Sequence, residues 1–331
     1  ASDVYKRQVE NLSLAGRLVL RRRFGKLTFA HLQDFSGKLQ IALERDKVCT
    51  ENLQGKEAYD FFQKLIDLGD FLGVQGDLMR TKTGEITLSV RRFWLLSKAL
   101  RPLPEKFHGL RDLEACYRQR YLDLLVNEET RKRFELRANV VKAFRDILDS
   151  HGFIEVETPV LVPTPSGAMA TPFVTHHKAL DIPVYLRIAP ETYLKRLLVG
   201  GYERVYEFAR SFRNEGMDPS HLQEFTLLEY YCAYWNYEDN MQFTEKLLSE
   251  VVERSTGSPR INFRGHKIDF SPPWPRVTFE EVLKEHAGVR PQDFPTADSL
   301  RQELRRRNIE VENCLLYTSD AADEGLGVDL G

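Results

Sequence analysis

The sequence predicts an α+β protein with two domains, a small β-barrel followed by a larger domain built on an antiparallel sheet. Residues 12–98 contain five strand-like runs and one amphipathic helix, an arrangement that suits a small barrel. Residues 205–234 contain two alternating runs joined by Gly, Asp and Pro, which is typical of a β-hairpin. The chain of 331 residues is long enough for two hydrophobic cores.

Both ends of the chain are expected to be translated sequencing adapter, outside the protein itself. The head, residues 1–8, and the tail, residues 314–331, can be encoded by the two strands of one transposon-type adapter. We therefore set them aside, as one sets aside other segments foreign to a protein. The formal net charge of −2 then becomes +1, because the head carries +1 and the tail −4. A near-neutral chain neither favours nor excludes RNA as a partner.

The first domain, expected at residues 9–98, has the element order of an OB-fold. The expected strands are Leu14–Arg23, Leu27–Asp34, Lys38–Arg45, Phe71–Arg80 and Glu85–Leu96, and the helix has a stripe of Ala58, Phe61, Phe62 and Leu65. Phe29 and His31 share one strand face and Gln40 lies on the next strand, so a base can stack on the ring and bind the amide. Barrel packing and ordinary surface are the alternative interpretation.

A linker is expected at residues 99–120, where prolines punctuate the chain, and the second domain at residues 121–313. A long helix begins near Glu128 and ends before Gly152, and the strand Phe153–Thr158 follows it. The apolar stripe of the long helix consists of Val140, Val141, Phe144, Ile147 and Leu148. This stripe packs either on its own domain or on a second subunit.

The hairpin is expected to carry, on one face, side chains that suit two kinds of ligand group. By the two-residue period of a strand, that face holds Val205, Glu207, Ala209, Ser211 and Arg213 on the first strand and Phe225, Leu227, Glu229 and Tyr231 on the second. A guanidinium can bind phosphate, a ring can stack on a base, and a carboxylate can bind an ammonium group. The alternative is an amphipathic hairpin with a solvated charged face.

Other residues give weaker indications. Pro190 and Glu191 are suited to the start of a helix, where a carboxylate also complements the helix dipole.

The adjacent His176 and His177 point to opposite strand faces, so we expect no metal site there. Cys49, Cys116 and Cys232 have no paired spacing, which favours free thiols and a cytoplasmic location. No apolar run approaches the ~18 residues of a membrane span.

The motif FRNEG with His221, Phe225 and Glu229 behind it resembles motif 2 of class II aminoacyl-tRNA synthetases. The stretches YLRIAPETYLKRLLVGGYERVYEF and KALRPLPEKFHGLRDLEACYRQRYLDL resemble lysyl-tRNA synthetases in particular, and the resemblance extends from about Leu14 to about Phe270. It implies an OB-fold anticodon-binding domain and a class II catalytic domain. It further implies ATP-dependent attachment of lysine to tRNA(Lys) by a homodimer, formed through the long helix and strand of motif 1.

The resemblance also implies roles for individual residues. In the ATP site Arg213 would bind the α-phosphate as the catalytic residue, Phe225 would stack on adenine, Glu215 would lie near the adenine amine, and His221 would lie near the outer phosphates. The implied lysine-binding residues are Gly167, Glu191, Glu229 and Tyr231. The implied anticodon-binding residues are Phe29, Gln40 and Glu85. Two carboxylates suit a substrate with two ammonium groups.

The chain also departs from the pattern of that family. Thr171 stands where an Arg is usual, so no phosphate contact is expected from it, and a Ser precedes Gly167 where a second Gly is common. The family's Mg²⁺-binding carboxylates and the Arg of motif 3 would lie beyond Asn313, so we expect no metal ligands in this fragment and no activity from it alone. Gly325–Gly331 imitates motif 3 but lacks that Arg.

Three other functions stay open at this point. An aspartyl- or asparaginyl-type synthetase would need cationic or amide partners for its substrate's side chain. A lysine ligase that modifies a translation factor would lack the OB-fold. The third is a non-catalytic fragment that binds tRNA or dimerises.

Overall fold

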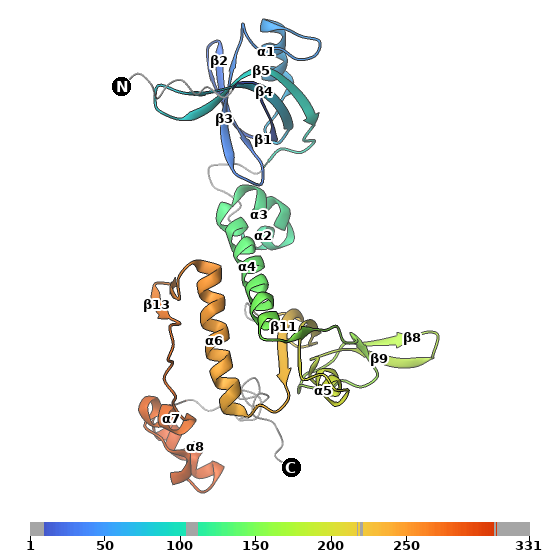
Figure 1. Cartoon of the computed structure of the whole chain (residues 1–331), viewed down its shortest axis with the longest axis vertical. Coiled ribbons are helices and arrows are strands. Elements are labelled where there is room, and N and C mark those ends of the chain that lie inside the picture. The colour runs from blue at the N-terminus through green and yellow to red at the C-terminus, as the bar shows by residue number, and fades with distance from the viewer. Residues whose placement is uncertain (1–9, 104–111, 217, 219–220, 308, 310–331) are drawn as a thin grey trace. The chain divides into compact units, whose positions relative to one another are not determined.

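The structure is a computed structural model of the whole chain, shown in Figure 1. It describes residues 10–103, 112–216, 218, 221–307 and 309. The expected adapter segments, 1–8 and 314–331, lie outside this part of the chain, as do residues 104–111 of the expected linker. The chain divides into two compact units, residues 1–132 and 133–331.

The first unit contains a closed five-stranded barrel in the order β1-β2-β3-β5-β4. Its elements are β1 (Leu12–Phe24), β2 (Leu27–Gln33), β3 (Lys38–Glu44), α1 (Gly55–Leu65), β4 (Phe71–Arg80) and β5 (Ile86–Ser97). β3 and β5 pair in parallel and the other neighbours are antiparallel. The predicted strands and their OB-fold order are confirmed. Two short helices, α2 (Leu113–Arg118) and α3 (Arg120–Val126), complete the elements of this unit before α4.

Helix α1 covers the barrel with a different stripe from the predicted one. Ala58 and Phe62 are buried as expected, but Leu65 is 56% exposed and Tyr59 is fully buried. The Tyr59 hydroxyl lies 2.7 Å from Thr28 Oγ1, so the buried phenol is hydrogen-bonded. The prediction failed at Leu65 because a hydroxyl partner on β2 makes Tyr59 acceptable in the core.

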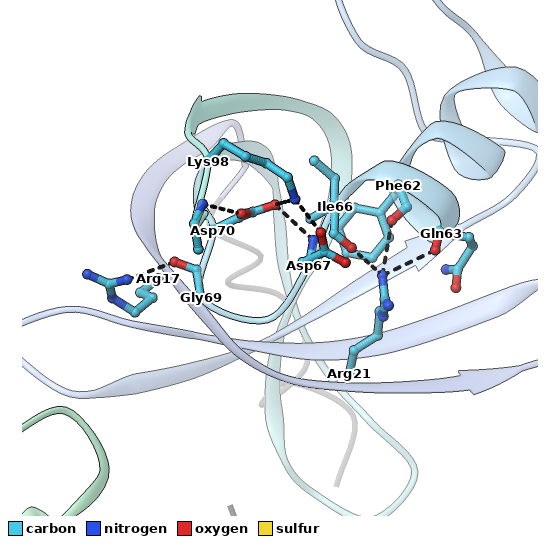
Figure 2. Close-up of polar contacts among 10 residues, drawn as sticks. Arg17, Arg21, Phe62, Gln63, Ile66, Asp67, Gly69, Asp70 and Lys98 are labelled. Atoms are coloured by element: carbon cyan, nitrogen blue, oxygen red, sulfur yellow. Dashed lines mark hydrogen bonds and ion pairs between the residues drawn. The ribbon is translucent and has the colours of Figure 1, made fainter. Parts of the chain in front are cut away.

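Polar contacts secure one end of the barrel (Figure 2). The Arg21 guanidinium donates to the carbonyl of Ile66 at 2.7 Å and to those of Phe62 and Gln63 at 3.2 and 3.4 Å, where α1 ends. The fully buried Asp70 accepts hydrogen bonds from Lys98 Nζ at 2.8 Å and from the Ala99 amide at 2.7 Å. These bonds fix the position at which the chain leaves the barrel.

The second unit is built around the hairpin β10–β11. The helices are α4 (Glu128–Ser150, which begins in the first unit), α5 (Glu191–Val199), α6 (Tyr237–Thr256), α7 (Phe279–Ala287), η1 (Pro291–Asp293) and α8 (Ala297–Arg306). The strands are β6 (Ile154–Glu155), β7 (Leu161–Val162), β8 (Val174–His177), β9 (Ile182–Leu186), β10 (Arg204–Phe212), β11 (Glu224–Cys232), β12 (Arg260–Phe263) and β13 (His266–Asp269). They form the sheets β11-β10-β6, β7-β9-β8 and β12-β13.

The long helix ends as the sequence predicts. Gly152 adopts a left-handed φ of 77°, and the amide of Phe153 donates to the Leu148 carbonyl at 3.1 Å, which is the pattern of a glycine cap. The strand after it is shorter than predicted, because β6 has two residues, and it pairs with β10 in parallel. The helix stripe packs on its own unit, since Ile147 and Leu148 are fully buried.

One face of the hairpin packs against α4 and α6. Tyr206 from β10 lies in a core cluster with residues of both helices, and Phe208, Leu228 and Tyr230 pack against this cluster. These residues alternate with the predicted site residues along both strands. The opposite face of the hairpin, which carries Glu207 and Glu229, is therefore directed away from this core.

Candidate functional site

The predicted face of the hairpin is confirmed by the strand register. Across β10 and β11 the paired residues on this face are Val205 with Tyr231, Glu207 with Glu229, Ala209 with Leu227, and Ser211 with Phe225. Just beyond the strands, the Arg213 amide donates to the Gln223 carbonyl at 2.9 Å, which continues the same register. Directly opposite residues share a face of an antiparallel pair, so one surface carries all the polar groups that the sequence indicated.

A pocket of about 580 Å³ lies at the loop end of this face. Its lining residues are Arg213, Glu215, Gly216, Asp218, His221, Leu222 and Phe225. All four residues predicted for the ATP site are therefore in one cavity. The guanidinium carbon of Arg213 is 5.3 Å from the centre of the Phe225 ring, so a cation and an aromatic face are adjacent.

Neighbouring residues hold the loop side chains of this pocket in place. A Glu215 oxygen accepts from the Thr171 amide at 3.2 Å, and the Thr171 carbonyl accepts from the Asn214 amide at 2.7 Å. His221 Nδ1 lies 2.5 Å from an Asp218 oxygen. Thr171 thus positions the pocket through its backbone, a role that its side-chain chemistry does not indicate.

A second polar group of residues lies farther along the same face, where α5 packs against β11. The Tyr231 hydroxyl donates to Glu229 at 3.1 Å, and Lys195 Nζ lies 2.5 Å from Glu191 on α5. Burial, together with the charges of Glu191 and Glu207 and against the Tyr231 hydrogen bond and the charge of Lys195, raises the pKa of Glu229 to about 7. Burial likewise raises the pKa of Tyr231. This region therefore favours a cation.

Gly167 packs against the first turn of α5 and has no room for a side chain. Its φ is +88°, and a Cβ atom built on it would lie 3.0 Å from the Cβ of Glu191 and 3.1 Å from that of Ala189. The four residues predicted to bind lysine are thus linked, because Gly167 touches Glu191 and the charge of Glu191 acts on both Glu229 and Tyr231.

A buried ion pair beneath this region was not predicted. Arg187, just after β9, is 2.7 Å from Glu207, and both side chains are 5% exposed. The same guanidinium donates to the carbonyl of Arg210 at 2.7 Å and to the Thr158 hydroxyl at 2.9 Å. The signal that was available is a charged residue, Arg187, within an otherwise apolar stretch.

The barrel carries a separate group of predicted residues on β2, β3 and the turn before β5. His31 and Gln40 are register partners, and His31 Nε2 lies 3.3 Å from a Glu85 oxygen. The Gln40 amide donates to Thr87 Oγ1 at 2.7 Å. Phe29 is half-buried two residues before His31, and its ring meets the edge of Phe24 at 6.0 Å. Phe24, which is 60% exposed, was not predicted as part of this surface.

Two family descriptions match the chain. Residues 12–96 match the OB-fold nucleic acid binding domain, and residues 112–328 match the tRNA synthetases class II (D, K and N). The chain belongs to the class II tRNA synthetases. The α+β architecture of an OB-fold and a class II catalytic domain is thereby confirmed. The match includes residues 314–328, so the expectation that this segment is translated adapter stays a prediction, as do the domain boundaries.

The relatives of this class II synthetase chain are lysine–tRNA ligases. It is 54% identical to the enzyme of Magnetococcus marinus over 274 residues, which are 82% of this chain and 54% of that protein. It is 50% identical to the enzyme of Pelotomaculum thermopropionicum over 299 residues, or 90% of this chain and 58% of that protein. The chain spans between about half and three-fifths of the length of these relatives.

The described part of this synthetase chain contains no group of three or more His, Cys, Asp or Glu residues that could hold a metal ion. His176 instead lies 3.1 Å from Asp181 in an exposed pair. Among the described residues no cluster of ligands is therefore already assembled around a position for Mg²⁺. Within the same described ranges, no helix is both long and apolar enough to cross a membrane.

Proposed function

We propose that the protein, at the full length of its relatives, activates lysine with ATP and transfers it to tRNA(Lys). The observation that carries this proposal is the single hairpin face that joins the Arg213 pocket to the carboxylates of Glu191 and Glu229. ATP and a diamino acid would then lie end to end, which brings the lysine carboxylate to the α-phosphate.

In the first step the lysine carboxylate attacks the α-phosphorus of ATP, and pyrophosphate leaves. Arg213 would stabilise the negative charge that develops on the α-phosphate oxygens. Phe225 would stack on adenine, with Glu215 near the exocyclic amine and His221 near the outer phosphates. Positioning and charge stabilisation supply most of the catalysis in such in-line displacements. Class II synthetases in general also use Mg²⁺, which would add positive charge to the site.

Two carboxylates would select lysine by its two ammonium groups. Glu191 would bind the α-ammonium group at the start of α5, and Glu229 with Tyr231 would bind the side-chain ammonium group. Gly167 would let the amino-acid loop approach Glu191 closely. Aspartate or asparagine would meet two carboxylates, and the nearby Lys195 is already paired with Glu191, which disfavours the aspartyl- and asparaginyl-type alternatives.

In the second step the 3′-terminal ribose hydroxyl of tRNA(Lys) attacks the lysyl carbonyl, and AMP leaves. The barrel would bind the anticodon through Phe29, Gln40 and Glu85, with a base stacked on the ring. The enzyme would act as a cytoplasmic homodimer through the motif 1 region.

Lysine binding tests the assignment of the two carboxylates. Leaving a buried ammonium without its charge partner costs about 3–5 kcal/mol. We expect Glu191→Gln and Glu229→Gln each to weaken lysine binding at least tenfold in calorimetry, with ATP affinity unchanged. Glu224→Gln, an exposed carboxylate on the same strand, serves as the control. Normal lysine binding in both site variants would refute the two-carboxylate pocket.

A further inference from the structure

Glu207 lies directly opposite Glu229, one of the residues proposed to bind the amino acid, on the hairpin β10–β11. It is the register partner of Glu229 across β10 and β11, so the two side chains leave the same face. Directly opposite residues of an antiparallel pair have Cβ atoms about 4.5–5.5 Å apart. Two carboxylates are thus placed side by side, and Glu191 on α5 adds a third acidic group to the surroundings of Glu229.

The position of Glu207 is fixed by neighbours from three segments. Arg187 binds one carboxylate oxygen at 2.7 Å, and the Thr158 hydroxyl donates to the other at 2.6 Å. Arg187 is itself held by the carbonyls of Arg210 and Thr158 at 2.7 and 3.1 Å. A buried carboxylate with both oxygens occupied cannot turn away from its neighbour. Its carboxylate is therefore held in one place beside Glu229.

Glu229 has a different environment from Glu207. It is half-buried and accepts a hydrogen bond from Tyr231. The charged groups that act on it are Glu191 and Lys195 from α5 and Glu207 from β10. Lys195 is paired with Glu191 at 2.5 Å, so the positive charge of Lys195 offsets the charge of Glu191 more than it offsets the charge of Glu207. Of two neighbouring carboxylates, the one without a buried cation is the one that takes up a proton.

We propose that Glu207 is a positioning residue for Glu229: its charge adds to the effect of burial, so that Glu229 binds a proton in the absence of substrate and releases it when a substrate ammonium group arrives. The exchange is balanced, because a neutral carboxylic acid and an ammonium ion become an ion pair and one proton enters the solvent. This inference rests on the proposed function, since the ammonium group is that of lysine. Arg187 would act through Glu207 by holding it.

The pH dependence of lysine binding follows from this exchange. Burial and the neighbouring carboxylates raise the pKa of Glu229 to about 7, so only the ionised fraction binds lysine. Lysine affinity should therefore be about tenfold lower at pH 6 than at pH 8. In Glu207→Gln the amide keeps the shape but loses the charge; its oxygen can still accept from Arg187, and its NH2 group can donate to the Thr158 oxygen in place of the bond that the carboxylate accepted. We expect the Glu229 midpoint to fall and the affinity ratio to shrink to about twofold.

The experiment is a ¹³C-carboxyl NMR titration of Glu229 in the protein continued to the full length of its relatives, followed by lysine calorimetry at pH 6, 7 and 8. Glu224→Gln is the matched control, because it removes an exposed carboxylate from the other face of β11. We expect a Glu229 midpoint near 7 in the wild type and control and a lower one in Glu207→Gln. An unchanged midpoint in a folded Glu207→Gln variant would overturn the inference.

Proton release gives a second readout that needs only the wild type. Calorimetry at pH 7 in buffers of different ionisation enthalpy should show release of about half a proton for each lysine bound. Binding without proton release would overturn the inference and leave the proposed function standing. If lysine failed to bind at every pH, the proposed function would fail, and the Glu229 titration would still decide the role of Glu207.

Discussion

Replacing Gly167 by Ala tests whether the amino-acid loop positions Glu191. At a φ of +88° an alanine is strained, which costs about 1–2 kcal/mol. The new methyl group would also lie 3.0 Å from the Glu191 Cβ and 3.1 Å from the Ala189 Cβ, where ordinary contacts begin near 3.4 Å. The loop and the first turn of α5 must therefore separate by a few tenths of an ångström.

Such a shift acts on the proposed binding geometry as well as on stability. A displacement of about 1 Å can cost 10²-fold in a positioned site, so we expect about a tenfold loss of lysine affinity. Gly201→Ala is the matched control, since its φ is +100° and nothing lies within 4 Å of the added Cβ atom. Both variants should lose stability from backbone strain in urea unfolding, with a larger loss in Gly167→Ala because of its close contacts, and Gly167→Ala alone should lose lysine affinity in calorimetry. Equal lysine affinity in the two variants would show that the contact with Glu191 does not matter.

Three further predictions concern the barrel and the carboxylates. Phe29→Ala should weaken tRNA binding by about 1–3 kcal/mol in filter binding and leave lysine-dependent ATP–pyrophosphate exchange unchanged; an equal loss of both would make Phe29 a core residue. Gly76→Ala should destabilise the barrel by about 3 kcal/mol in urea unfolding, because its Cβ would lie 1.9 Å from the Ser89 carbonyl oxygen. In the control variant Gly73→Ala the new Cβ meets no atom closer than 3.4 Å, so the loss of stability should be far smaller. Glu229→Gln should be more stable than the wild type at pH 8 but not at pH 5. The reason is that the pKa of Glu229 is raised to about 7, so wild-type stability falls as pH rises through 7; the same difference in stability between variant and wild type at both pH values would contradict the raised pKa.

The alternation of side chains along a strand was enough to predict which residues share one face of the hairpin. Glu207 and Glu229 fall on one side because the strand period is two, and the observed register adds only which residues are directly opposite. The glycine cap at Gly152 was equally predictable, because a glycine that follows a long amphipathic run is suited to a left-handed φ. These features depend on local sequence alone.

The features that sequence did not reveal depend on contacts between distant segments. Arg187 binds Glu207 twenty residues later and Thr158 twenty-nine residues earlier, and no local pattern predicts that such a pair is buried. The exposure of Leu65 in place of Tyr59 depends on the hydroxyl of Thr28 on another strand. The roles of Gly167 and Glu191 came from the family resemblance, and the structure adds that these two residues are in contact.

Amino-acid-dependent ATP–pyrophosphate exchange tests the central claim most directly. The protein to assay is residues 9–313 continued to the full length of the lysine–tRNA ligases that the chain resembles. Lysine, aspartate and asparagine would each be supplied alone at pH 8, where Glu229 is ionised. We predict rapid exchange with lysine and none above background with the other two. Exchange with aspartate or asparagine, or none with lysine in a folded protein, would contradict the two-carboxylate site on the β10–β11 hairpin.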